Sequence, residues 1–202
     1  MSLTDVEVCS SALAMIGANP ISSLTDGNAE AKICAAIYEI TVQDAISTYR
    51  WRFASGQELL NRLADEPIAG RWDSAYQKPP ELLTVSAVRA GGATIPYEIM
   101  GDNIYSYTGS ETEVFAEGTY RVNEDKWPPY FTRLIELRLA SKLAQSLAER
   151  TDLANSMDAQ AMRQASVART ADSQSRTARQ LNMSRFTARR FRGSFQRDDF
   201  YS

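Results

Sequence analysis

The residues best suited to molecular recognition stand near the C-terminal end of the chain, where arginines and aromatic residues alternate. An arginine guanidinium is a planar fork that pairs with carboxylates or phosphates and stacks on aromatic rings. Aromatic side chains beside arginines are typical anchors of protein interfaces. The candidate contact residues are Arg185, Phe186, Arg189, Arg190, Phe191, Arg192, Phe195, Arg197, Phe200 and Tyr201.

This C-terminal segment has no helical periodicity, and two interpretations stay open. It is either a disordered tail or a segment that becomes ordered when it docks onto a partner. Docking is favoured, because the four aromatic residues after residue 190 need pockets that an isolated tail does not have.

The formal charge of the chain divides at about residue 162. Residues 1–162 carry 13 Lys and Arg against 22 Asp and Glu, a net charge of −9. Residues 163–202 carry 9 Arg against 3 Asp, a net charge of +6. This division predicts an acidic body and a basic arm that makes contacts.

Catalytic chemistry has little support in the residue types. The sequence has no histidine and no phosphate-binding glycine motif, which removes imidazole acid–base catalysis and phosphate-cradling loops. Cys9 and Cys34 are too few for a disulfide framework or a zinc site and are expected in the core. The sequence therefore predicts a protein that is not an enzyme and needs no cofactor or metal.

The remaining catalytic hypothesis is a pair of carboxylates, as in glycan hydrolases. Such residues are common on solvated surfaces, which is the interpretation favoured here. The candidate carboxylates are Asp65, Glu66, Glu111, Glu113 and Glu117.

The elements that must position these residues begin with two helices. Thr4 and Glu7 have the spacing of a capping box, apolar residues then recur every three or four positions, and Gly17 predicts the helix end. A second helix is expected at 28–49. The run Trp51-Arg52-Phe53-Ala54 follows it, and its two aromatic rings are expected in the core.

The middle of the chain predicts a small antiparallel β insert. Residues 65–80 contain three prolines and a glycine and are expected to form an exposed loop. The run Gly101-Asp102-Asn103 has the composition of a hairpin turn. Strands are expected at 82–88, 94–100, 103–107 and 113–122.

Two further helices are expected, at 130–149 and at 153–180. The second is rich in Ala and polar residues, so it has high helix propensity but little apolar surface to bury. It forms either a solvated edge or a helix that packs closely on a neighbouring copy or lengthens with a partner. The predicted fold class is mainly α: a helical bundle body at 1–180 with a β insert at about 82–122, and an extended arm at 181–202.

Several runs resemble the head-to-tail adaptor proteins of tailed bacteriophages, also called tail tubular protein A or head-completion connectors. The run Leu-Ala-Met-Ile-Gly-Ala-Asn-Pro-Ile-Ser-Ser-Leu-Thr-Asp at 13–26 is similar to their N-terminal signature. The runs at 31–34 and 51–54 resemble the A-x-x-C/A and W-x-F-A elements of the following helix. Tyr120-Arg121-Val122, Trp127-Pro128 and the helix at 134–147 resemble the return from the insert, so the similarity covers roughly residues 3–165.

This resemblance implies a structural role in the virion neck, after assembly in the host bacterial cytoplasm. It implies a dodecameric ring below the portal protein, with the helical body forming the ring, the β insert facing the tail and the C-terminal arm reaching the portal. The contact candidates at the C-terminal end then become portal-binding residues, assigned from their chemistry because the family's C-termini vary widely.

The implied partners are the portal protein, further copies of the chain, a downstream tail or nozzle protein and DNA passing through the lumen, with no membrane. Two alternatives stay open. One is a virion-associated peptidoglycan hydrolase, and the other is a DNA-binding packaging or assembly protein.

Overall fold

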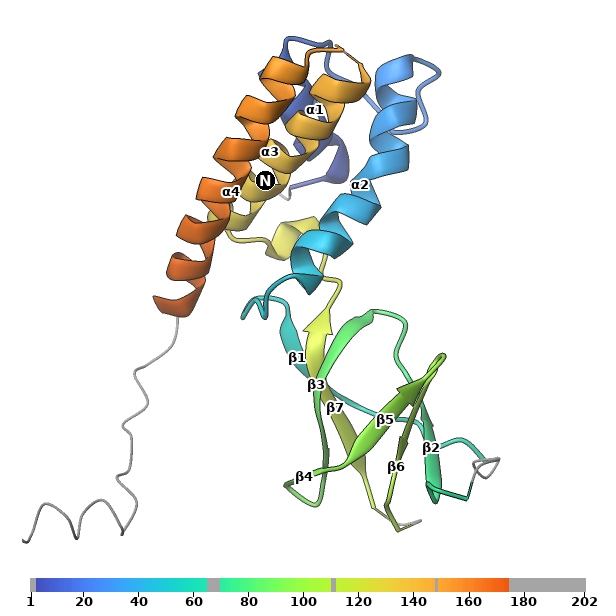
Figure 1. Ribbon diagram of the computed structural model, residues 1–202. Helices are drawn as coiled ribbons and strands as arrows, with labels where there is room; N and C mark the ends of the chain where they lie inside the picture. The colour runs from blue at the N-terminus through green and yellow to red at the C-terminus, as the bar shows by residue number, and fades with distance from the viewer. Residues whose placement is uncertain (1–2, 65–69, 110–111, 148, 175–202) are drawn as a thin grey trace, which may run out of the picture.

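The computed structural model describes residues 3–64, 70–109, 112–147 and 149–174. These residues form four α-helices and seven antiparallel strands and are 46% helical and 23% strand. A helical body and a β module lie end to end, and the β module is inserted between the second and third helices (Figure 1). The predicted mainly α fold class is therefore wrong, and the fold is mixed α/β.

The fold class is corrected chiefly by two strands that the sequence pattern did not predict. β1 (Ser55–Leu59) begins directly after the aromatic run and has no alternation of apolar residues. β2 (Ser74–Gln77) falls inside the predicted loop at 65–80. The single strand predicted at 94–100 is divided by Pro96, which has no N–H for a ladder.

The helices of the described residues are α1 (Asp5–Ile16), α2 (Ala29–Ser47), α3 (Pro129–Ser146) and α4 (Thr151–Gln174). The predicted capping box is confirmed, because the Glu7 N–H donates to the Thr4 hydroxyl at 3.2 Å and the Thr4 N–H donates to the Glu7 carboxylate at 2.9 Å. Gly17 ends α1 in the left-handed conformation with φ 76°. Local signals of this kind set the helix boundaries.

The core of the helical body is built around Trp51, which is 1% exposed. Its ring packs edge-on against Phe131 with centroids 5.1 Å apart, and its indole N–H donates to the Ala45 carbonyl at 2.8 Å. The predicted core position of this aromatic ring is confirmed. Cys9 and Cys34 are buried in the same core as free thiols, which also agrees with the prediction.

The Ala-rich helix α4 packs along α3 of the same chain. Ala161, Ala165 and Ala168 are buried in this contact, because small side chains let two helices approach closely. The opposite face of α4 is exposed. The described part of this helix is therefore a component of the body, and the part predicted at 175–180 lies outside the described residues.

The β module has two sheets around a small core of its own. The first has the order β1-β7-β3-β4 and the second the order β2-β6-β5. The predicted hairpin is confirmed, since β5 pairs with β6 across a turn in which Gly101 has φ 60°. The remaining strands are β3 (Leu82–Ala90), β4 (Ala93–Ile95), β5 (Tyr97–Met100), β6 (Asn103–Ser106) and β7 (Val114–Tyr120).

An ionic cluster joins the two parts near the point where the chain leaves the β module. Arg121 donates to Glu39 of α2 at 2.9 Å and to Glu124 of the short 3-10 helix Glu124–Lys126 at 2.6 Å. The hydrogen bonds from Arg121 hold the pKa of Glu39 below its ordinary value. Tyr38 also donates to Glu124, at 2.9 Å. The junction is thus held by directed polar contacts.

A second polar contact fastens the end of α4 at the same junction. The carboxylate of Asp172, which is 0% exposed, accepts the backbone N–H of Arg52 at 3.1 Å and the hydroxyl of Tyr130 at 3.0 Å. Burial, together with this hydrogen bond, raises the pKa of Tyr130 to about 12. The last described turn of α4 is therefore held beside the start of the β module.

Candidate functional site

The predicted contact residues of the arm, from Arg185 to Tyr201, lie outside the described residues. The candidate carboxylates Asp65, Glu66 and Glu111 do as well. Of the two that are described, Glu113 is exposed and Glu117 is paired with Arg89 at 2.7 Å. The structure therefore places Glu117 in an ion pair on the sheet surface.

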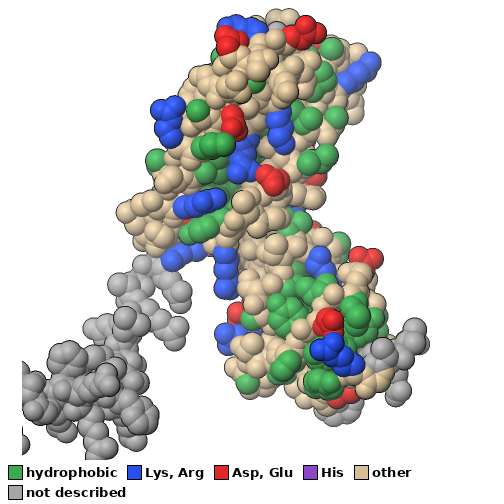
Figure 2. All heavy atoms as spheres, in the orientation of Figure 1, with side chains coloured by type: hydrophobic (Ala, Val, Ile, Leu, Met, Phe, Trp, Pro, Cys, Tyr) green, Lys and Arg blue, Asp and Glu red, His purple; other side chains and the backbone are tan. Residues whose placement is uncertain are grey.

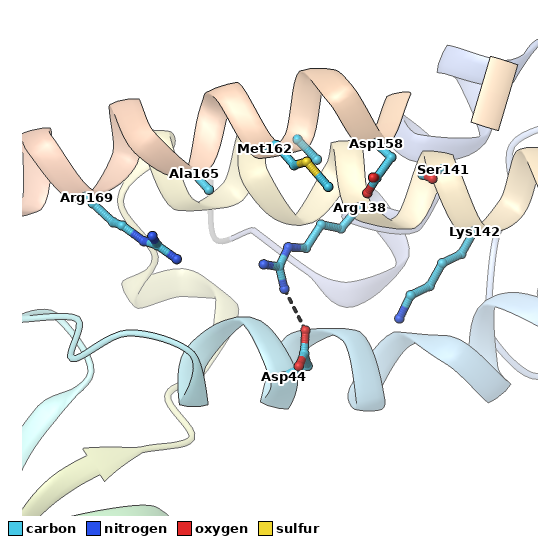
Figure 3. A pocket seen from close by; sticks show the side chains of 9 residues that line it. Asp44, Arg138, Ser141, Lys142, Asp158, Met162, Ala165 and Arg169 are labelled. Atoms are coloured by element: carbon cyan, nitrogen blue, oxygen red, sulfur yellow. Dashed lines mark hydrogen bonds and ion pairs between the residues drawn. The ribbon is translucent and has the colours of Figure 1, made fainter. Parts of the chain in front are cut away.

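The described residues form an open groove of about 420 Å³ on the helical body. It lies between α2, α3 and α4, and Figure 3 shows the side chains of the three helices pointing toward one another across it. We call this feature the body groove. Its lining consists of Asp44, Arg138, Ser141, Lys142, Asp158, Ala161, Met162, Ala165 and Arg169.

The body groove carries three cations and two carboxylates. Arg138 reaches across it to Asp44 at 2.7 Å, an ion pair in which the arginine is the more buried partner. Lys142 donates to the buried hydroxyl of Thr41 at 2.8 Å. Arg169 lies over the ring of Tyr49, with its guanidinium carbon 5.5 Å from the ring centroid. These side chains are thus held in place by groups on α2 and directly after it.

Apolar side chains accompany these charges. Met162 is 68% exposed at the rim of the groove, and Ala161 and Ala165 form part of the lining. Figure 2 shows hydrophobic and basic side chains next to each other on the same face of the body. An exposed methionine beside positioned cations suits contact with a protein surface that combines apolar and acidic groups.

The sequence contains signals for the body groove that were not used to predict it. Arg138 and Lys142 are four residues apart on α3, and on α4 the groove residues recur every three or four positions. That spacing places them on one face of each helix. Asp172 had no comparable signal, because its partners Arg52 and Tyr130 are far away in the sequence.

Two further observations concern the chemistry open to this part of the chain. The described ranges hold no helix long and apolar enough to cross a bilayer. Within the same ranges, no three or more Cys, Asp or Glu side chains gather as a possible metal site.

No protein-family model matches the chain, and no curated protein is significantly similar to it.

Proposed function

We propose that the chain is a structural head-to-tail adaptor of a tailed bacteriophage, which forms a ring below the portal and extends the DNA channel. The observation that carries the proposal is the division of the chain into a helical body and a β module that lie end to end (Figure 1). A subunit of this shape offers separate surfaces to two different partners. In the proposal, the body joins neighbouring copies and the portal, and the β module faces the tail.

The motifs that resemble the adaptor family occupy structurally important places. The run at 13–26 covers the end of α1 and its left-handed glycine cap. Trp51 is the buried centre of the body core. Trp127, just before α3, packs edge-on against Phe131. The resembling residues are thus those that form the body and its junction with the β module.

The body groove suits contact between neighbouring copies in this proposal. Residues 1–162 have a net charge of −9, and the groove adds exposed Met162 and positioned cations to one face of that acidic body. Arg138, Lys142 and Arg169 would meet carboxylates of the next copy, which gives such a contact its register. Closure into a ring keeps a head-to-tail contact from extending into a filament.

The acidic body also suits a DNA conduit. A wall that repels phosphates lets a duplex slide through, whereas a basic wall would hold it. In the same proposal the basic arm at 181–202 docks onto the portal, with aromatic residues as anchors and arginines pairing with acidic groups.

The decisive experiment is sedimentation of portal with the full chain and with a chain that lacks residues 181–202. We expect the truncated chain to stay in the supernatant and the full chain to sediment with the portal. Phe191→Ala should mainly speed dissociation, higher salt should mainly slow association, and Thr187→Ala in the same segment serves as the matched control. Equal sedimentation of both chains would show that the arm is not the docking element.

The ring itself is tested by electron microscopy of portal with the bound chain. Two-dimensional class averages along the channel axis should show rotational symmetry in the density that the chain adds. Additional density without rotational symmetry would contradict the proposed ring.

A further inference from the structure

The β module has a gap beside β1, at the edge of its first sheet. β1 is the end strand of its sheet, and four of its five residues are exposed. Its ladder with β7 runs without a register shift, and the Tyr120 N–H donates to the Ala54 carbonyl at 2.8 Å. Because hydrogen-bonding residues alternate along an antiparallel ladder, the backbone groups of Gln57 and Leu59 face away from β7.

A proline explains why this edge is left open. Beyond β1 the chain pairs with β2, and the Gln77 N–H donates to the Asn61 carbonyl at 3.0 Å. Continuing that antiparallel register by two residues places Pro79 opposite Leu59. Proline has no N–H to donate, so the ladder between this segment and β2 ends there, and β1 has no partner strand on that side.

Two hollows border this gap and share Glu58. One has about 420 Å³ and the other about 130 Å³. We call the gap with its two hollows the β1 slot. Its lining includes Phe53, Gly56, Glu58, Leu59, Pro79, Pro80, Glu81, Tyr120, Arg121 and Lys126.

The β1 slot differs in chemistry between its two faces. Successive side chains of a strand point to opposite faces, so Glu58 and Leu59 lie on different sides of β1. Leu59 is 48% exposed, an apolar residue without cover. Within the described ranges, neither Glu58 nor Glu81 takes part in an ion pair, whereas Arg121 of the same hollow is already paired with Glu39 and Glu124. Glu58 and Glu81 therefore outnumber Lys126 in this hollow, and an added strand should be basic on that side and apolar on the side that covers Leu59.

We propose that in the free protein the β1 slot binds residues 189–197 of the same chain as an added strand. In an extended chain in this range Arg190 and Arg192 lie on one side, and Phe191 and Phe195 lie on the other, with Arg189 and Arg197 at the two ends of that aromatic side. The aromatic side then covers Leu59, and the basic side meets the carboxylates of the slot. Backbone hydrogen bonds to an open edge supply the affinity, as in other cases of strand addition.

The position of α4 brings this segment close enough. Asp172 accepts the backbone N–H of Arg52, which lies three residues before β1. The last described residue of α4 is Gln174, and residues 175–188 then connect it to the binding segment. Fourteen residues span up to roughly 46 Å when extended, so the slot of the same chain is within reach.

This contact gives the arm two alternative binding sites. A segment that fills the β1 slot is not available to the portal, and binding to the portal leaves the β1 edge open to a strand from another protein. The movement of the arm from the β1 slot to the portal rests on the proposed adaptor function, whereas occupation of the slot in the free chain does not.

Amide hydrogen exchange measured by nuclear magnetic resonance on the full chain tests the contact at single residues. The outward-facing amides of Gln57 and Leu59 should exchange at least about tenfold more slowly than in the Arg190→Glu/Arg192→Glu chain. The amides of Gly56 and Glu58, which face β7, should exchange equally in both chains and serve as the internal control.

A variant in which the charges on both sides of the contact are reversed distinguishes the specific contact from a general effect of the substitutions. Adding Glu58→Arg and Glu81→Arg to the Arg190→Glu/Arg192→Glu chain should restore slow exchange at Gln57 and Leu59. Equal rates at these two amides in the full and charge-reversed chains would overturn the proposal. Protection that increases with protein concentration would also overturn it, because the strand would then come from a second copy. Sedimentation with the portal is a separate measurement. The contact in the β1 slot and the docking of the arm onto the portal can therefore each fail alone.

Discussion

The helical body and the β module are stabilised in different ways. The body has a large core with a cluster of aromatic rings, in which Trp51 contacts Phe53 and Phe131. The β module has a small core and depends on close backbone contacts, above all at Gly118, where an added Cβ would lie 2.1 Å from the Thr84 carbonyl oxygen. One part is therefore sensitive to loss of side-chain volume, and the other to gain of volume.

The largest expected effect is in the body. Trp51→Ala should lower the free energy of unfolding by about 3–5 kcal/mol, because it removes a fully buried ring and its hydrogen bond to Ala45. Chemical denaturation measures the change. Trp72→Ala in the β module is the matched variant and should cost less, since the Trp72 ring packs on the exposed Tyr107. Equal costs would remove the contrast between the two parts.

The next effect is in the β module. Gly118→Ala should lower the free energy of unfolding by about 1–3 kcal/mol, because the new methyl group overlaps the backbone of β3. Gly27→Ala is the control, since a Cβ at Gly27 meets no atom within 4 Å. If thermal unfolding shows that Gly118→Ala leaves the stability unchanged, then β3 and β7 are not packed as closely as described.

The smallest effect is at the junction between the two parts. The folded-state pKa of Glu39 lies below its ordinary value of 4.5, so its pairing with Arg121 stabilises the fold above that pH. This stabilisation is lost as the pH falls through the folded-state pKa. Because Glu39 is about half exposed, Glu39→Gln should cost less than about 1 kcal/mol at pH 7.

Thermal unfolding between pH 7 and pH 3 tests the pairing of Glu39 with Arg121. The difference between the wild-type chain and Glu39→Gln should become smaller as the pH falls below 4.5. Glu113→Gln, at an exposed position, should show no such convergence. A difference that is constant across the pH range would mean that the ion pair does not contribute.

The two parts also differ in how much of them the sequence predicted. The boundaries of α1 follow from Thr4 and Gly17, and the hairpin between β5 and β6 follows from Gly101, because each signal acts within a few residues. β1 and β2 depend on pairing with distant strands, β7 and β6. Their own residues carry too little apolar alternation to predict that pairing.

The candidate sites show the same limit. The arm was predicted from its unusual chemistry but lies outside the described residues. The body groove requires three helices to meet, and no single helix shows that its cations face one space. Asp172 is buried only because the end of α4 reaches Arg52, a contact between residues 120 positions apart. Such features depend on the assembled fold.

The insertion of the β module has a mechanical consequence. The chain enters and leaves the module through adjacent segments that are hydrogen-bonded to each other, with the Tyr120 N–H donating to the Ala54 carbonyl at 2.8 Å. Load applied to the far end of the module is therefore delivered to the body at this junction, next to the Arg121 ion pairs. The contacts of α2 with β3 and β7 lie at the same junction, so the helices receive such a load through α2 as well.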